Sequence, residues 1–173
     1  LEVLNQFPND AFVMISDADE IPNKNTIESA VKSISFNQPA VGFVQDFFIY
    51  NLNQKLEEPW IGTVLTTNSF VKKQTPQWFR TNRTSFFRVK NSGWHITYSG
   101  SPEDIQYKID SFAHQEFNVE KFKELDYIQE RVQVGQDLYG RPFPVVRVNP
   151  NTFPKDFLLS FKKYLPKGKL VFL

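Results

Sequence analysis

The stretch that decides the fold is Ala11-Phe12-Val13-Met14-Ile15-Ser16-Asp17-Ala18-Asp19-Glu20-Ile21-Pro22, an apolar run that ends in three carboxylates. An unbroken apolar run predicts a strand buried on both faces, of the kind found in a parallel α/β sheet. Open α/β sheets bind ligands in the crevice beyond the carboxyl ends of their strands. On an extended backbone Asp17 and Asp19 point the same way, so both can reach one hard cation through oxygen ligands.

The composition narrows the class of protein. The 173 residues suffice for one domain with its own core, and a hydrophobic content of 40% is ordinary for a globular protein. The net charge of +1 argues against a protein that binds nucleic acid or a membrane surface by electrostatics. There is no cysteine, which excludes disulfides, thiolate metal sites and a cysteine nucleophile.

The sequence shows no apolar run of transmembrane length and no signal peptide. It begins with Leu1 rather than Met and enters a core strand almost at once, so we expect a piece of a longer protein.

Strand and helix patterns alternate in the first part of the chain. Asn23 or Asn25 can cap a helix whose apolar positions follow helical spacing: Ile27, Ala30, Val31 and Ile34. Thereafter we expect strands at 41–51 and 60–67, a polar hairpin loop at 52–59, irregular backbone at 76–83 and a strand at 84–89. This alternation predicts an α/β fold.

Turn residues at 91–93 precede a predicted strand at 94–98. Ser101 and Pro102 then begin a helix, with Ser as the N-cap and acids in the first turn. Asn118 caps a further helix, and beyond Gly135 only a short helix at 156–164 is expected. We therefore expect a catalytic core at 1–134, forming the C-terminal part of its domain, and an irregular extension at 135–173 that packs on the core.

The acidic stretch supports more than one interpretation. A cation between Asp17 and Asp19 would be placed to grip a diphosphate, which makes a sugar-nucleotide transferase the first hypothesis. Alternatively, these acids flank a solvated turn before Pro22. Phosphatases with an aspartyl nucleophile also carry Asp-x-Asp after a strand, but a hydroxyl residue and a Gly-rich turn usually follow, and Glu20-Ile21-Pro22 supplies neither.

The two histidines are the other candidate metal ligands. His95 lies on a predicted strand beside Trp94, where a core imidazole is an equal alternative. His114 ends the helix that begins at Pro102, where the helix dipole alone favours a cation. Either could complete a metal site with Asp19, because imidazole suits Mn²⁺ better than Ca²⁺.

Glu103 and Asp104 stabilise the first turn of their helix and need no other reason to be there. An inverting sugar transfer, however, needs one carboxylate near the acceptor hydroxyl, and Glu103 could supply it.

Several cations and indoles are candidates for substrate contact, although each is more commonly a solvated or core residue. They are Arg80, Arg83, Arg88, Lys72, Lys73, Trp60, Trp78 and Trp94. Asn82-Arg83-Thr84 is a glycosylation sequon, which matters only in a secreted chain.

Taken in order, four motifs resemble glycosyltransferase family 17, the family of the β-1,4-mannosyl-glycoprotein β-1,4-N-acetylglucosaminyltransferase. They are Ile15 to Pro22, Gly93-Trp94-His95, Pro102-Glu103, and the stretch from Lys108 to Phe117 that contains Ser111-Phe112 and His114. The likeness spans residues 10–128.

The resemblance implies a GT-A-like fold, a Rossmann-like mixed sheet flanked by helices, which lacks its N-terminal βα units in this chain. It also implies a UDP-sugar donor (UDP-GlcNAc by analogy), Mn²⁺ or Mg²⁺, inversion at the anomeric carbon, and a glycan or glycoprotein acceptor, as in protein N-linked glycosylation. It leaves the compartment open between the cytoplasm of a microbe or virus and the lumenal face of the Golgi membrane in a eukaryote. The resemblance implies that Asp17, Asp19 and His114 bind the metal, with His95 as the alternative histidine. It implies that Glu103 is the catalytic base, with Asp104 as the second choice. The substrate contacts that we expect are Glu20, Trp94, Arg83 and Arg88. The alternatives are a carbohydrate-binding or truncated remnant of the fold without activity, and a phosphoryl-transfer enzyme that uses Asp17.

Overall fold

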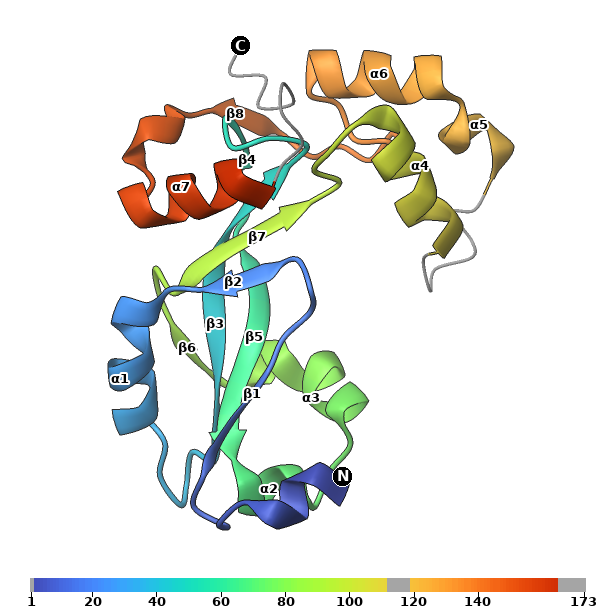
Figure 1. The fold of residues 1–173 in the computed structure, drawn as a ribbon. Helices are drawn as coiled ribbons and strands as arrows, with labels where there is room; N and C mark the ends of the chain where they lie inside the picture. Colours follow the sequence, from blue (N-terminus) through green and yellow to red (C-terminus); the bar gives the residue numbers. More distant parts are fainter. Residues whose placement is uncertain (1, 112–118, 165–173) are drawn as a thin grey trace. The chain divides into compact units, whose positions relative to one another are not determined.

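The computed structural model describes residues 2–111 and 119–164 (Figure 1). Contacts divide the chain into two compact units. Unit 1 consists of Leu1–Asp46 with Glu58–His95, and unit 2 consists of Phe47–Glu57 with Ile96–Leu173. The strands β3 (Ala40–Ile49) and β7 (Gly93–Thr97) each begin in unit 1 and end in unit 2. The predicted division at residue 135 stays a prediction.

The fold is mixed α/β, with a mixed sheet flanked by helices, as predicted, and it is compatible with a GT-A-like class. In unit 1, β5 (Trp60–Thr67) pairs antiparallel with both β1 (Phe12–Ile15) and β3, while β6 (Phe87–Val89) runs parallel to β3. The short strand β2 (Glu20–Pro22) pairs antiparallel with β7, which places Glu20 opposite His95.

The prediction that β1 is buried on both faces, as in a parallel sheet, is wrong. It is an antiparallel strand at the end of the sheet path, and Phe12 and Met14 are 48% and 37% exposed. The alternate residues Val13 and Ile15 pack against the core around Val64. Because an antiparallel strand can leave one face to solvent, an apolar run does not by itself prove burial on both faces.

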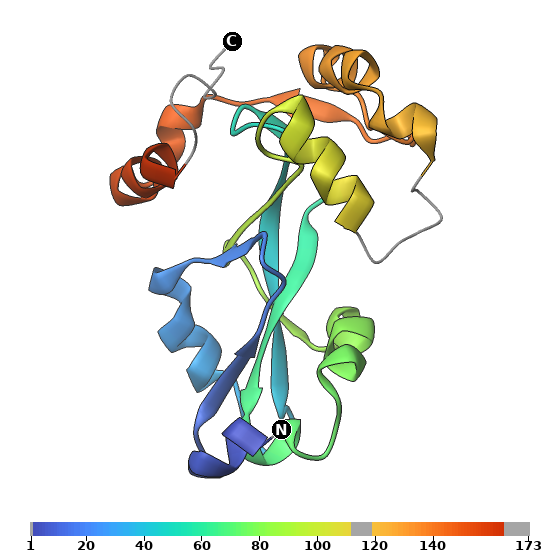
Figure 2. The same cartoon turned by 45° about the vertical axis from the view of Figure 1, so that its right-hand side comes forward.

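Helices lie on both sides of the sheet of unit 1 (Figures 1 and 2). As predicted, Asn23 caps α1 (Lys24–Lys32), with its side chain accepting a hydrogen bond from the backbone of Asn25 at 3.1 Å. Ala30 of α1 packs on Val41, Phe43 and Leu65.

The second helical layer of unit 1 contains α2 (Asn68–Val71), α3 (Pro76–Asn82) and the 3₁₀ turn η2 (Arg83–Ser85). The prediction of irregular backbone at 76–83 is wrong. Thr75 caps α3, because its hydroxyl accepts a hydrogen bond from the Trp78 backbone N–H at 3.1 Å, and Pro76 is the first residue of the helix. Phe79 is fully buried against Ala40, Val64 and Val71. Its burial fixes the helix that carries Arg80. The remaining element of unit 1 is the 3₁₀ helix η1 (Glu2–Gln6).

Unit 2 holds the rest of the secondary structure. Its strands besides the ends of β3 and β7 are β4 (Gln54–Leu56), inside the predicted loop, and β8 (Val145–Arg147). Its helices are α4 (Pro102–Ser111), α5 (Glu120–Lys123), α6 (Leu125–Val134), the 3₁₀ turn η4 (Pro150–Thr152) and α7 (Lys155–Tyr164). The predicted helices at Pro102 and 156–164 are thereby confirmed. The proposed cap Asn118 lies outside the described residues.

The core of unit 2 joins the strand ends to the helices. Ile49 and Leu56 pack with Ile105, Ile109 and Ile128, all nearly inaccessible to solvent. Within residues 2–111 and 119–164, no helix has the length and apolar character needed to cross a membrane.

Candidate active site around Glu20

The acidic stretch lies at a junction of strands in unit 1. β1 ends at Ile15, and a turn follows in which the Glu20 backbone N–H donates to the carbonyl of Asp17 at 3.1 Å. The pairing of β1 with β5 brings Ser16 beside Thr63, with 2.8 Å between their hydroxyl oxygens. Because this segment turns, the extended-backbone argument for Asp17 and Asp19 does not apply, and their shared cation stays a prediction.

Glu20 is a buried carboxylate at the centre of the cluster, with its side chain 2% exposed. Its Oε1 accepts a hydrogen bond from the indole N–H of Trp60 at 2.7 Å. Its Oε2 accepts from the Asp17 backbone N–H at 3.1 Å and from the Thr63 hydroxyl at 3.2 Å. A charged group out of contact with water is tolerated only when it is paired and hydrogen-bonded, and this carboxylate meets both conditions.

The missing side chain at Gly62 leaves room for this network. A Cβ at position 62 would collide with Oε1 of Gln45 and lie 2.8 Å from Oε1 of Glu20. Gln45 is itself fully buried and donates to the Thr63 hydroxyl at 3.2 Å. Glycine is therefore required here for space.

Trp60 links the carboxylate to two further groups. Its ring stacks on that of His95, with 4.6 Å between centroids and 22° between planes, and the Arg83 guanidinium carbon lies 4.1 Å from its centroid. Arg83 NH1 is also 3.6 Å from Oε1 of Glu20. Burial lowers the pKa of Arg83, while the nearby charges of Glu20 and Asp17 oppose that shift.

Asp17 forms a bidentate ion pair with Arg80. The Nε of Arg80 lies 3.0 Å from Oδ1, and its NH2 donates to Oδ2 at 3.1 Å. Arg83 NH1 is 3.9 Å from the same Oδ2. Two parallel charge-assisted hydrogen bonds hold a carboxylate more firmly than one, so the Asp17 side chain is oriented toward Arg80 and Arg83.

Asp19 has a different neighbour. Its Oδ1 lies 3.7 Å from Nδ1 of His95, and the two side chains are 26% and 7% exposed. One carboxylate oxygen and one imidazole nitrogen form a donor set suited to Mn²⁺, and hard cations of this kind often complete their coordination with waters and substrate phosphates.

The structure describes only some of the predicted metal ligands. Within its described residues, no three His, Cys, Asp or Glu side chains are placed to hold one ion. His114 lies outside those residues. Of the predicted ligands, the structure brings Asp19 and His95 together, and a cation bound by this pair stays a prediction.

Two further candidates lie on strands of unit 1. Arg88 is exposed on β6 and donates to the carbonyl of Thr84 at 3.1 Å. Trp94 is partly buried on β7, opposite Ile21.

In unit 2, Glu103 and Asp104 are exposed in the first turn of α4. Asp104 Oδ2 accepts from the Ser101 backbone N–H at 2.8 Å and from its hydroxyl at 2.7 Å, while the Asp104 backbone N–H donates back to that hydroxyl at 3.2 Å. Ser101 is thus the N-cap, as predicted, and Asp104 completes a capping box with it.

A comparison with protein families gives the class: a transferase that acts on a sugar donor and an acceptor. The model of glycosyltransferase family 17 matches residues 2–144, and the chain belongs to that family. The match includes the whole cluster around Glu20 and the start of α4. No curated protein and no solved structure matches the chain significantly.

Proposed function

We propose that this protein is a metal-dependent inverting glycosyltransferase that moves N-acetylglucosamine from UDP-GlcNAc to a glycan hydroxyl. Family membership supports glycosyl transfer in general. The metal, the donor, the sugar and the acceptor are the proposed part. The observation that carries the proposal is the 3.7 Å approach of Asp19 to His95 beside two arginines that already bind a carboxylate.

We assign the cation to Asp19 and His95, with His114 as a further candidate ligand. Asp17 remains a second candidate, and a cation there would compete with Arg80 for its oxygens. A bound divalent ion supplies positive charge that stabilises the departing diphosphate.

Arg80 and Arg83 are proposed to bind the diphosphate. Each guanidinium now faces carboxylate oxygens of Asp17, and phosphate oxygens suit the same planar fork. The stack of Arg83 on Trp60 holds that guanidinium in a defined orientation. Trp60 and Glu20 are therefore positioning residues in this proposal.

Glu103 is proposed as the base that accepts the proton of the attacking hydroxyl. Asp104 is the weaker candidate because its carboxylate is engaged by Ser101. Glu103 belongs to unit 2, and the proposal for it rests on its carboxylate, its exposure and the family's motif.

The test is release of UDP from UDP-GlcNAc by the full chain with Mn²⁺, with and without a glycan acceptor. Asp19→Asn and His95→Gln should each lower the rate by roughly a hundredfold, since each removes one proposed ligand. Glu28→Gln, an exposed change on α1, should leave it unchanged. Turnover that persists in EDTA, or in Asp19→Asn, would refute the metal assignment. A folded protein that binds a glycan without releasing UDP would support the remnant alternative.

The stereochemical part is tested separately. The product of an inverting enzyme has the opposite anomeric configuration to the donor, which proton NMR of the product reports. Retention of configuration would remove the role proposed for Glu103.

A further inference from the structure

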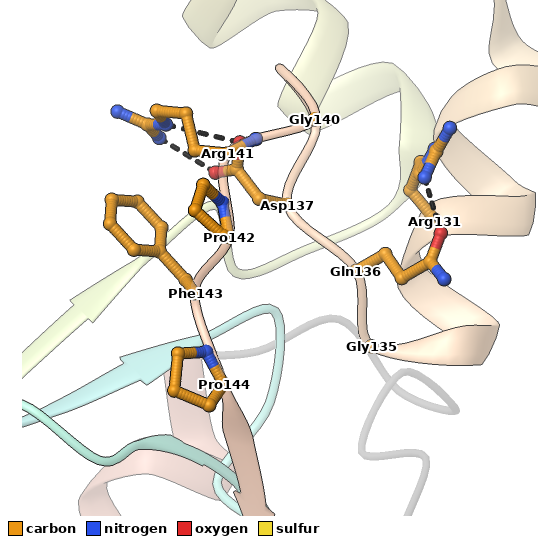
Figure 3. Close-up of a pocket in the computed structure, with 9 residues that line it drawn as sticks. All are labelled: Arg131, Gly135, Gln136, Asp137, Gly140, Arg141, Pro142, Phe143 and Pro144. Atoms are coloured by element: carbon orange, nitrogen blue, oxygen red, sulfur yellow. Dashed lines mark hydrogen bonds and ion pairs between the residues drawn. The ribbon is translucent and has the colours of Figure 1, made fainter.

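A pocket of about 660 Å³ lies in unit 2, between the end of α6 and the start of β8 (Figure 3). Its walls come from one stretch of chain, residues 131–144, so its shape depends on unit 2 alone. None of the residues that line it belongs to the cluster around Glu20.

The polar wall is built around a fixed ion pair. Arg141 donates from NH2 to Oδ1 of Asp137 at 2.7 Å and from Nε to Oδ2 at 3.0 Å. The Asp137 side chain is 6% exposed, and its Oδ2 also accepts from the backbone N–H groups of Tyr139 and Arg141 at 2.9 and 3.0 Å. The pair is held in place before any ligand arrives, which reduces the entropy that binding must overcome.

A second polar pair lines the same pocket. Arg131, on the last turns of α6, donates from NH1 to the side-chain oxygen of Gln136, and its guanidinium carbon lies 4.9 Å from the ring centroid of Tyr127. Gln136 is exposed and carries both a donor and an acceptor on one planar amide.

The apolar wall is an aromatic ring flanked by prolines. Phe143 is 41% exposed, with the Arg141 guanidinium carbon 4.6 Å from its ring centroid. Pro142 and Pro144 adjoin it in sequence and also line the pocket (Figure 3).

We propose that this pocket binds a neutral oligosaccharide. A pyranose offers an apolar C–H face, which suits the Phe143 ring, and a rim of hydroxyls that both donate and accept, which suits the planar Arg141–Asp137 and Arg131–Gln136 pairs. Asp137 balances the charge of Arg141, and Arg131 faces the neutral amide of Gln136, so the lining carries one net positive charge, too little to neutralise a multiply charged anion. The identity of this saccharide as the acceptor rests on the proposed function, whereas the binding does not.

The test is titration of the full chain with mannotriose and with chitotriose, followed by saturation-transfer NMR. At least one trisaccharide should bind, and Phe143→Ala should weaken it by about tenfold because it removes the stacking face. Gln136→Ala should weaken it by about threefold or more. Tyr107→Ala, a change of an aromatic side chain that is 74% exposed on α4 outside the pocket, should bind like the wild type.

The proposal is overturned if neither trisaccharide binds, or if Phe143→Ala binds as tightly as Tyr107→Ala. It is also overturned if inorganic pyrophosphate displaces the trisaccharide, because the pocket would then be an anion site.

Acceptor-independent UDP release, measured on the same samples, separates this proposal from the function proposed above. Phe143→Ala should retain it in full. A wild type that releases UDP but binds neither trisaccharide would refute only the proposal for the pocket. A wild type that binds saccharide through Phe143 but never releases UDP would refute only the transferase.

Discussion

The indole N–H of Trp60 donates a 2.7 Å hydrogen bond to Oε1 of Glu20, a carboxylate whose side chain is 2% exposed. The same indole stacks on His95 and lies beneath Arg83. A buried negative charge therefore sets the orientation of an aromatic ring, and that ring contacts two of the proposed substrate-binding and metal-binding side chains.

Glu20→Gln should destabilise the protein by about 3 kcal/mol, because it removes the charge that Arg83 faces and leaves a buried donor without its acceptor. Urea unfolding at neutral pH measures the change. The matched substitution Glu28→Gln breaks an exposed ion pair with Lys32, in which the two side chains are 72–80% exposed, and should cost less than about 1 kcal/mol. Equal effects of the two variants would show that the buried network contributes no special stability.

Gly62→Ala should destabilise by about 2 kcal/mol, since the added methyl group meets Gln45 and Glu20 inside a packed core. Gly140 provides the comparison, because a Cβ there meets nothing within 4 Å although its φ is +74°. Gly140→Ala should therefore cost about 1 kcal/mol, through backbone strain alone. A Gly62→Ala protein as stable as the wild type would mean that the two side chains move apart freely.

Arg80→Ala should tighten the binding of Mn²⁺ by about threefold to tenfold, because it frees the oxygens of Asp17 and removes a neighbouring positive charge. Water-proton relaxation measures the affinity. Arg88→Ala, which removes an exposed cation outside the cluster, should leave it unchanged. Unchanged affinity in Arg80→Ala would leave Asp19 as the sole aspartate in the cation site.

Alkaline pH should destabilise unit 2. Burial raises the pKa of the Tyr98 phenol far above its ordinary value, and the hydrogen bond with Tyr139, 2.9 Å between oxygens, adds to the shift. In the unfolded chain the Tyr98 phenol ionises near pH 10, whereas in the folded protein it stays protonated. The stability that this phenol contributes is therefore complete below about pH 10 and is lost as the pH rises further.

Urea unfolding at two alkaline pH values tests this. Each such phenol steepens the fall in stability by up to about 1.4 kcal/mol per pH unit, and Tyr98→Phe should therefore show a shallower fall. Tyr50→Phe should act similarly, because burial, and then the charge of Asp137, raise the pKa of Tyr50. If stability fell with pH as steeply in both variants as in the wild type, the raised pKa values of Tyr98 and Tyr50 would be contradicted.

Local patterns predicted most of the elements. The Asn23 cap with its helical spacing, the β-rich stretches that became β3 and β5, and the Ser101-Pro102 start of α4 each depend on neighbours in sequence. The helix α3 carries an equally local signal, since Thr75 followed by Pro76 marks a helix start, and the prediction of irregular backbone at 76–83 overlooked it.

The arrangement of the site depends on pairing between distant strands. Sequence reasoning named Asp19 and His95 separately, but their 3.7 Å contact follows from the pairing of β2 with β7. Thr63 and Gln45 were missed because a polar residue inside a β-rich stretch looks like a solvent-facing position. The exposure of Phe12 likewise depends on an edge position that an apolar run does not reveal.

The chain enters unit 2 at Phe47, returns at Glu58 and leaves again at Ile96. Unit 1 is thus assembled from two separate stretches, and no deletion from either end can isolate it. A protein shortened to residues 1–95 would keep the excursion at 47–57 but strip Ile49 and Leu56 of Ile105 and Ile128, against which they pack. Those exposed aliphatic side chains would promote aggregation, so deletion mapping would report the loss of functions that depend on the cluster around Glu20 although every group of that cluster was still present.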